Sequence, residues 1–463
     1  MRLFIVGLLC LLLALPALAQ PAHQVVDLNT NLEDFTAPLF TAQELVVMGT
    51  TVFFVENDGI HGTELWKTDG TAAGTVLVKD ICPGDCASFP QQLTVWNGVL
   101  YFGADDGVHG VEPWRSDGTA AGTSMILDLD PGLAASAPRF LAAGASLYMS
   151  ADDGVHGREL WKTDGTAAGT QLVADIRPGA AGSDPRLWLD LGNGKLLLNA
   201  DDGVHGREPW ISDGTAAGTS LLLDVNPGAA DSSFNFPLPT TDNDAVALGG
   251  GSFLFKADDG THGPEPWLSD GTPGGTSLLA DINPGASGSY PLGFTRVGSL
   301  ILFGASDDTD GQELWGTDGT PGGTARVLDI NPGTPSSGLH LLTAVGGQLY
   351  FAATDGTHGR ELWKSDGTAA GTAMVKDVNP GSGDGISIFA HGRIQPFNGG
   401  VLFFADDGTH GLEPWQSDGT AAGTALVKDV QPGSGWGVDT LVSSIAVAGA
   451  TAFFRGITVD HGN

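Results

Sequence analysis

The chain has 463 residues, including 70 Gly and 26 Pro, and only 16% of them are charged. Its 54 acidic residues against 20 basic ones give a formal net charge of −34 at pH 7. A surface this acidic repels phosphate backbones, so the composition argues against nucleic-acid binding. Cations, basic proteins and neutral sugars remain compatible partners.

The first residues predict a secretory signal peptide over residues 1–19. Arg2 supplies a positive charge, Leu3 to Leu15 is apolar, and Ala17-Leu18-Ala19 forms a cleavage site before Gln20. A membrane anchor is the alternative, but the apolar run is short for a span. We therefore expect a secreted, periplasmic or cell-surface protein with no transmembrane span after cleavage.

Residues 20–44 form an N-terminal strand segment, and a repeat array is expected over residues 45–463. His23 to Leu28 resembles the last strand of a repeat module, such as Leu426 to Val430 near the other end. This lone strand could pair with the last module and close a ring, because closure hides sheet edges. The alternative is that the chain is a fragment and the ring is open.

One motif organises the array. Glu64 to Thr75 reads Glu-Leu-Trp-Lys-Thr-Asp-Gly-Thr-Ala-Ala-Gly-Thr, and related copies follow seven more times. Self-similarity at a period near 50 residues indicates a solenoid, a propeller or another repeat fold. The tryptophans of the eight copies are Trp66, Trp114, Trp161, Trp210, Trp267, Trp315, Trp363 and Trp415.

This motif resembles the ELWxxDGT repeat of secreted and surface bacterial proteins, from about residue 45 to the end of the chain. Four copies read Glu-Leu-Trp and four read Glu-Pro-Trp. The resemblance implies a β-propeller with no well-defined shared activity. It carries over no catalytic residues.

Each module predicts four short strands, as the second module illustrates. Its strands are expected at Leu93–Trp96, Val99–Ala104, Glu112–Ser116 and Met125–Leu129, with Gly-rich turns between them. The second strand is apolar on both faces in most copies, so each sheet should be covered on both sides. Radial stacking of four-stranded blades provides that cover. We expect an all-β fold, a β-propeller of about eight four-stranded blades plus a partial ninth.

The turn between the second and third strands is a candidate metal site. It reads Asp-Asp-Gly-x-His-Gly in many copies and brings two carboxylates close to an imidazole. Such a set suits Ca²⁺ or a transition metal. Asp-Gly is also a strong hairpin signal, so a purely structural turn is the alternative. The candidate ligands are Asp105, Asp106, His109, Asp152, Asp153 and His156.

Cysteine and tryptophan supply two further predictions. Cys82 and Cys86 are expected to form a disulfide in an oxidising compartment. Two free thiols are the alternative, because so short a loop constrains the geometry. The repeat tryptophans are expected to pack between blades. Tryptophans outside the motif are better candidates for binding a ligand, and they are Trp96, Trp188 and Trp436.

The function favoured by the sequence is a secreted, non-enzymatic binding or scaffold module for a protein or glycan. No sequence fingerprint of a known catalytic site appears in a supporting context. The alternative is a carbohydrate-active enzyme, a hydrolase or lyase, on a propeller. Its chemistry would fall on polar residues that break the repeat near one channel mouth, namely His340, His391, Arg393, Arg139, Arg186, Asp190 and Arg296.

Overall fold

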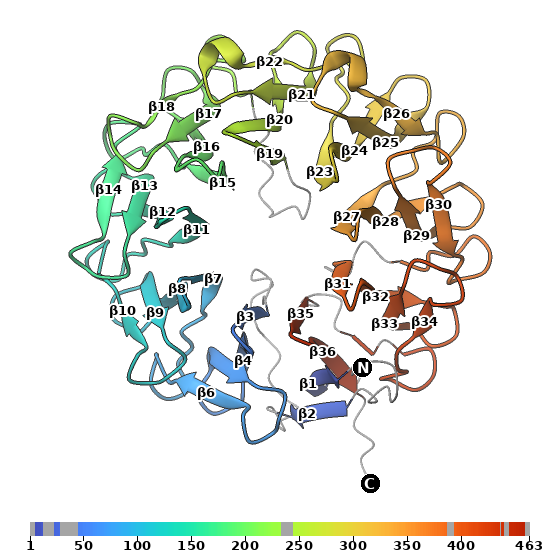
Figure 1. The fold of residues 1–463 in the computed structure, drawn as a ribbon. Coiled ribbons are helices and arrows are strands. Elements are labelled where there is room, and N and C mark those ends of the chain that lie inside the picture. The colour runs from blue at the N-terminus through green and yellow to red at the C-terminus, as the bar shows by residue number, and fades with distance from the viewer. Residues whose placement is uncertain are drawn as a thin grey trace.

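The computed structural model describes residues 5–12, 23–27, 45–232, 244–386, 393–435, 437–438 and 444–458. These residues form nine antiparallel sheets of four strands each. The sheets stand side by side around a central opening, each with one strand at the opening and one at the rim (Figure 1). The all-β prediction is therefore confirmed, and the only helices in the described ranges are two single 3-10 turns, η1 (Pro273–Gly275) and η2 (Pro321–Gly323).

The first and second strands of each module form the inner half of its sheet. The inner strands are β3 (Val46–Met48), β7 (Gln91–Trp96), β11 (Arg139–Ala143), β15 (Arg186–Asp190), β19 (Ala245–Gly249), β23 (Leu292–Val297), β27 (His340–Val345), β31 (Gln395–Phe397) and β35 (Ile445–Ala448). The second strands are β4 (Thr51–Asn57), β8 (Val99–Asp105), β12 (Ser146–Asp152), β16 (Leu196–Asp201), β20 (Ser252–Asp258), β24 (Leu300–Asp307), β28 (Gln348–Thr354), β32 (Gly400–Asp406) and β36 (Thr451–Thr458).

The third strands carry the Glu-Leu-Trp or Glu-Pro-Trp motif. They are β5 (Thr63–Thr68), β9 (Val111–Ser116), β13 (Arg158–Thr163), β17 (Arg207–Ser212), β21 (Pro264–Ser269), β25 (Gly311–Thr317), β29 (Arg360–Ser365) and β33 (Leu412–Ser417). The outer strands are β6 (Val76–Lys79), β10 (Ser124–Met125), β14 (Gln171–Ala174), β18 (Ser220–Leu221), β22 (Ser277–Leu278), β26 (Ala325–Leu328), β30 (Ala373–Lys376) and β34 (Ala425–Leu426).

The hydrophobic core lies between neighbouring sheets. One cluster joins Phe53 and Leu65 of the first sheet to Phe102 and Trp114 of the second, all of them buried. The second strand β8 is buried along five consecutive residues, so both of its faces are covered. This burial is the reason why the second strands are apolar without alternation, as the sequence predicted.

Outer-strand length follows the residue before the tryptophan. In the Glu-Leu-Trp sheets the outer strand has four residues, whereas in the Glu-Pro-Trp sheets it has two. Leu65 pairs with Lys79 beyond a bulge, whereas Pro113 has no N–H to donate and only accepts a bond from Ile126 N. Consequently, the strand expected over Met125–Leu129 is only the short β10. The proline also lies inside β9 rather than at its start.

The ninth sheet combines both ends of the chain. Its strand order is β2-β1-β36-β35, where β1 is Ile5–Leu12 and β2 is His23–Asp27. The sequence predicted the strands corresponding to β35, β36 and β2, but it assigned the residues of β1 to a signal peptide. An apolar run can form a strand where a sheet edge is free, and β1 pairs with β36 along its whole length. The predicted cleavage site, residues 17–20, lies outside the described residues.

The first and ninth sheets are in contact. Val52 of β4 packs with Ala446 and Phe453 in one buried cluster. Arg455 Nη2 lies 2.9 Å from Glu56 Oε1, and both side chains are about nine-tenths buried. No helix in the described ranges is long and apolar enough to cross a membrane.

Candidate functional site

The Asp-Asp-Gly-x-His-Gly turns are held together by their own side chains. Asp153 Oδ1 accepts hydrogen bonds from the backbone N of Val155 and His156, at 3.0 and 2.8 Å. Asp153 Oδ2 lies 2.7 Å from His156 Nδ1, and Asp152 Oδ1 accepts from Gly154 N. The hydrogen bond from Asp153 raises the pKa of His156. The turn beginning at Asp105 repeats this arrangement, with His109 Nδ1 2.8 Å from Asp106 Oδ2.

The residues predicted as metal ligands bond within their own turns, and the metal sites stay a prediction. The part of the chain that the structure describes contains no group of three or more His, Cys, Asp or Glu placed to hold a metal ion. The carboxylates of Asp106 and Asp153 are already used by backbone N–H groups and by the histidines. The second aspartate and histidine of each turn meet because they stabilise the hairpin, which was the alternative interpretation.

The glutamate of each Glu-Leu-Trp or Glu-Pro-Trp motif has a structural role that the sequence did not reveal. Glu64 is fully buried, and its carboxylate accepts hydrogen bonds from the N of Ile81, Cys82 and Ser88 and from Ser88 Oγ. These donors lie on the connection to the next sheet. Burial raises the pKa of Glu64, and it raises the pKa of Glu208, Glu313, Glu361 and Glu413 to about 7.

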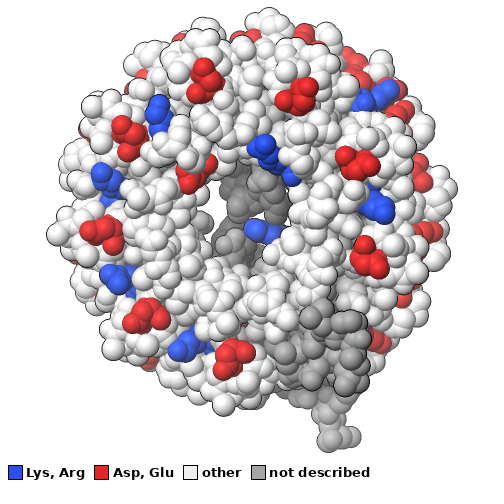
Figure 2. Space-filling model, in the orientation of Figure 1, with Lys and Arg blue, Asp and Glu red and all other residues white. Residues whose placement is uncertain are grey.

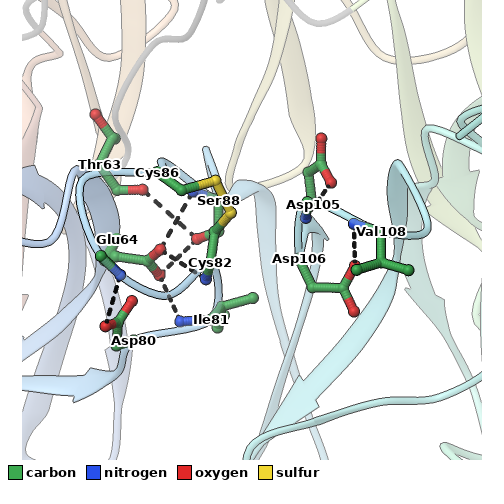
Figure 3. The surroundings of a disulfide bond; sticks show 12 residues. Thr63, Glu64, Asp80, Ile81, Cys82, Cys86, Ser88, Asp105, Asp106 and Val108 are labelled. Atoms are coloured by element: carbon green, nitrogen blue, oxygen red, sulfur yellow. Dashed lines mark hydrogen bonds between the residues drawn. A yellow bond between two sulfur atoms is a disulfide. The ribbon is translucent and has the colours of Figure 1, made fainter.

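A disulfide lies on the first of these connections (Figure 3). It joins Cys82 to Cys86, with Cα atoms 5.3 Å apart. Cys82 N donates to the buried Glu64, and Cys82 Sγ lies against Gly107 in the turn of the second sheet. Most other connections place a polar side chain here, for example Asn331 against Gly356 and Asn379 against Gly408. The disulfide therefore occupies a contact between neighbouring sheets.

Two of the three tryptophans outside the motif are described, and they do not form a common surface. Trp96 is half-buried, with its ring centroid 6.0 Å from that of Tyr101. Trp188 is half-buried against a core cluster that contains Leu197 and Phe253. Trp436 lies outside the described residues. The two described rings come from different sheets and contact different core clusters, so they are not brought together as a ligand platform.

Two of the repeat-breaking residues meet at one mouth of the central opening. Arg139 is the first residue of β11 and Arg186 is the first residue of β15, and these inner strands are neighbours. Arg139 pairs with Ser150 and Arg186 with Asn199, near the ends of β12 and β16. Both arginines therefore lie at the end of the opening from which the Asp-Asp-Gly turns extend. We call this end the entry mouth.

Two more arginines lie behind them, at the starts of the third strands. Arg158 of β13 directs Nη1 at Ala137 O and Ser150 O, at 2.9 and 2.8 Å. Arg207 of β17 is buried and directs Nη1 at Asp184 O, at 2.7 Å. Burial lowers the pKa of Arg158, as does the charge of Arg139. Burial and the charge of Arg207 likewise lower the pKa of Arg186. We call Arg139, Arg158, Arg186 and Arg207 the arginine cluster.

Two carboxylates accompany the arginine cluster. Asp184 Oδ2 lies 3.0 Å from Arg207 Nη2, and its Oδ1 lies 3.9 Å from Arg158 Nε. The Asp184 side chain is 44% exposed, so it is accessible to solvent despite these contacts. Asp244, just before β19, lies 2.6 Å from Lys256 Nζ. Both carboxylates are close enough to Arg186 to raise its pKa against the lowering effects.

Two of the other repeat-breaking candidates lie at the opposite mouth. Asp190 and Arg296 are at the opposite ends of their inner strands, where Asp190 accepts from Gly144 N and Arg296 donates to Leu248 O. His340 begins β27 and pairs with Ala352 near the end of β28, so it lies at the entry mouth, in the sheet between those of β23 and β31. Arg393 precedes β31, and His391 lies outside the described residues.

The sequence predictions missed Arg158 and Arg207 as site residues, together with Asp184 and Asp244. A signal was present in the residue that precedes the motif glutamate. This residue is Arg in two successive modules, whereas it is Thr63, Val111, Pro264, Gln312 or Leu412 in most others. Comparing modules column by column would have placed two arginine pairs in neighbouring sheets.

Comparisons with known proteins add a general likeness. No family model matches the chain, and no curated protein matches it. Among solved structures, the computationally designed Ika8 protein is similar at 16% identity and a TM-score of 0.41. The match covers 80% of this chain and 95% of the Ika8 chain. A prolyl endopeptidase gives 12% identity and a TM-score of 0.42, and a puromycin-hydrolyzing peptidase of Mycobacterium tuberculosis gives 13% and 0.39.

These neighbours correct one prediction. The expected function was a non-enzymatic binding or scaffold module, whereas the similar structures include puromycin hydrolases and prolyl endopeptidases, which are enzymes. The match spans 54% of the prolyl endopeptidase chain and 52% of the mycobacterial one, so about half of each is shared. The substrates in these names belong to those proteins and are not assigned to this chain.

Proposed function

We propose that this protein is a carbohydrate-active enzyme, a hydrolase or a lyase, that acts at the entry mouth. The observation that carries the proposal is the convergence of repeat-breaking polar residues there. Arg139 and Arg186 lie at the opening. Asp184 comes just before Arg186 in the chain, and Asp244 comes just before β19, the inner strand of the next sheet. Repetition suits a structural element, whereas a single departure from the repeat suits a single active site.

Asp184 and Asp244 are the candidate acid–base pair. Glycoside hydrolysis commonly uses two carboxyl groups that flank the scissile bond. Asp184 has a backbone φ of 45°, a left-handed conformation that Phe89, Ala137 and Tyr290 share at the equivalent positions of other modules, so the backbone here belongs to the repeat and only the carboxylate is distinctive. The neighbouring guanidinium groups would orient the carboxylate and the substrate.

The test is turnover of a glycan panel by the purified chain, with neutral and acidic oligosaccharides and with detection of both hydrolysis and elimination products. We expect D184N and D244N to lower kcat/KM at least about 100-fold, because general acid–base catalysis contributes about that much. D384N is the matched control, since Asp384 also pairs with an arginine, Arg360, in another sheet. Absence of turnover on every glycan, or equal loss in D384N, would refute the proposal.

We also propose that the nine sheets form a closed β-propeller related to the ELWxxDGT repeat proteins. Support comes from the buried cluster and the Arg455–Glu56 ion pair between the first and ninth sheets. Deleting residues 20–40, which include β2, should lower the melting temperature of the whole unit. An unchanged melting temperature would rule closure out.

Export is a further proposal, motivated by the signal-peptide pattern of residues 1–19. Cleavage after Ala19 would remove β1, which lies between β2 and β36, so β2 would have to pair with β36 in its place to remain in the ninth sheet. N-terminal sequencing of the protein from cells distinguishes the two outcomes. A mature chain that begins at Gln20 is expected, and an uncleaved chain would favour the strand role of β1.

A further inference from the structure

We propose that one half of the ring carries a docking surface for a basic, amphipathic segment of another protein. The surface lies on the side of the ring that bears the Asp-Asp-Gly turns and the connections between sheets, which we call the entry face. Its charged part is Asp130, and its apolar part is a set of exposed side chains. This inference goes beyond the proposed function and uses neither Asp184 nor Asp244. We call the exposed side chains the apolar arc, and they are Ile60, Val108, Leu133, Val155 and Val204.

The apolar arc comes from the first four sheets alone. In these sheets the residue before the turn histidine is aliphatic and 61–66% exposed. In the fifth, seventh and eighth sheets it is threonine, namely Thr261, Thr357 and Thr409. The turn of Thr357 has the same hydrogen bonds between its aspartate and histidine as the turn of Val155. An aliphatic side chain is therefore not needed to form the turn.

The connection from the second to the third sheet joins two members of the arc. On this connection Ala134 O lies against the turn of Val108, and Asp130 lies against the turn of Val155. Leu133 comes between these two contacts and is 80% exposed. Exposed alanines continue the surface on the next two connections, and they are Ala180, Ala181, Ala229 and Ala230. A continuous apolar surface rimmed by polar residues is typical of a protein interaction site.

Asp130 adds a negative charge that the fold does not use. After the fourth to seventh sheets the residue at this position is an asparagine, whose Nδ2 donates to the carbonyl five residues further on. An aspartate carboxylate cannot donate this bond. The Asp130 side chain has no hydrogen bond or ion pair with the described parts of the chain. Burial raises the pKa of Asp130, and the charges of Asp152 and Asp153 raise it further.

The cations nearest to these carboxylates are already engaged. His156 Nδ1 lies 2.7 Å from Asp153 Oδ2. Arg158 pairs with Asp152 in the ladder, but it directs its guanidinium at three backbone carbonyl groups. Asp130 therefore repels its neighbours without a structural gain, whereas a Lys or Arg of a partner would be attracted to it.

The charge of the whole chain selects the kind of partner. The chain has 54 acidic and 20 basic residues, and acidic side chains are spaced around most of the ring in the view of Figure 2. A second copy of the chain would bring a surface of the same sign and would be repelled. A segment with Leu, Ile or Phe side chains beside Lys or Arg matches both the apolar arc and Asp130.

The test uses a synthetic amphipathic helix of Leu and Lys, about 14 residues or roughly 21 Å long. Two matched peptides carry Ser in place of Leu, or Glu in place of Lys. Calorimetry in about 150 mM NaCl measures their binding, since salt screens weak long-range attraction. We expect the Leu–Lys peptide to bind at least about tenfold more tightly than either control peptide. Equal binding of a control peptide, or no binding of the Leu–Lys peptide at about 1 mM, would overturn the proposal.

A triple variant tests the apolar arc without disturbing the turns. V108T/V155T/V204T introduces the residue that later sheets carry at this position, so the fold should be kept. We expect it to weaken binding of the Leu–Lys peptide at least about tenfold, because apolar contact area is lost. T261S/T357S/T409S is the matched control, with changes at equivalent positions outside the arc. Equal affinities of the two triple variants would refute the arc as the binding surface.

D130N separates docking from folding. Asparagine removes the repulsion and can donate to the carbonyl five residues on, so the melting temperature should stay the same or rise. Binding of the Leu–Lys peptide should nevertheless weaken at least about fivefold. D281N is the control, because Asp281 is exposed on a connection outside the arc. Unchanged affinity in D130N would refute the role of Asp130. Sedimentation of the parent chain alone tests self-association, and a dimer abolished by V108T/V155T/V204T would assign the arc to a second copy and refute the proposal.

Discussion

At the scale of single residues, local chemistry was predictable and long-range chemistry was not. The Asp-Gly-Thr turn is an Asx turn, a structure that Asp before Gly favours, and Asp69 Oδ1 accepts hydrogen bonds from Thr71 N and Thr71 Oγ1. By contrast, the donors to Glu64 lie 17 to 24 residues further along the chain. A residue's neighbours in sequence do not reveal partners on a connection to the next sheet.

Removing one of these buried glutamates should destabilise the protein. In E159A, Ile176 N and Arg177 N would lose acceptors now at 3.1 and 3.0 Å. Ser183 N would keep its second acceptor, Arg158 O. A buried donor without a partner costs about 1–3 kcal/mol, so we expect a loss of about 3 kcal/mol in the free energy of unfolding. Urea denaturation measures it, with the exposed Q171A as control. A loss below about 1 kcal/mol would contradict this role.

Two adjacent glycines give a second test within one turn. A Cβ at Gly275 would overlap the carboxylate of Asp270, which accepts from Thr272 N and Oγ1, whereas a Cβ at Gly274 would meet nothing within 4 Å. We expect G275A to cost about 1–3 kcal/mol, because the Asx turn must open. G274A should stay within about 0.5 kcal/mol of the parent. Thermal and urea denaturation compare the two variants, and equal effects would show that the close approach to Asp270 is unimportant.

At the scale of the element, the sequence predicted strand existence better than strand ends. The strands expected at Val99–Ala104 and Glu112–Ser116 match β8 and β9 within one residue. The outer strand was expected to be five residues long, and β10 has two. Proline has no N–H, so it cannot donate a hydrogen bond to the neighbouring outer strand. The effect is therefore a shorter outer strand, while the strand that contains the proline keeps its length.

Hydrogen exchange should distinguish the two kinds of sheet. The outer strands of Glu-Leu-Trp sheets, such as β6 and β30, continue for two residues beyond those of Glu-Pro-Trp sheets, such as β10 and β34. We expect slower amide exchange in the fourth residue of β6 and β30 than in the equivalent residue after β10 and β34; the third position is no test, because Ile126 N and Val427 N still donate to Pro113 O and Pro414 O. Mass spectrometry of peptic peptides measures this difference. Uniform exchange across all eight outer strands would show that proline does not shorten the hydrogen-bonded ladder.

The candidate site also belongs to this scale, because neighbouring elements build it. Arg139 and Arg186 are 47 residues apart and meet only because β11 and β15 are adjacent. The sequence named both residues as departures from the repeat, but it gave no reason to join them. Arg158 and Arg207 were not selected as candidates, because each directly precedes the glutamate of the repeated motif and looks like part of that motif.

At the scale of the whole molecule, repetition multiplies small electrostatic effects. Hydrogen bonds from Thr71 lower the pKa of Asp69, and the other Asp-Gly-Thr aspartates behave in the same way. Stability from such groups is present above pH about 4 and is lost as pH falls through their folded pKa. The motif glutamates have raised pKa values, so their contribution to the free energy of unfolding changes with pH in the opposite direction.

The raised glutamates therefore predict a molecule that is most stable in mild acid. A group whose pKa rises from 4.5 unfolded to about 7 folded contributes stability that is complete below pH 4.5 and lost as pH rises through 7. The histidines of the Asp-His pairs, whose pKa is also raised, add to the same trend. Urea denaturation between pH 5 and 8 should show the free energy of unfolding falling, by about 3 kcal/mol for each of Glu208, Glu313, Glu361 and Glu413 at most. E361Q should be less stable overall but show a shallower slope, because one titrating group is gone. A slope that is flat or rises with pH would mean that the hydrogen bonds to these carboxylates outweigh their burial.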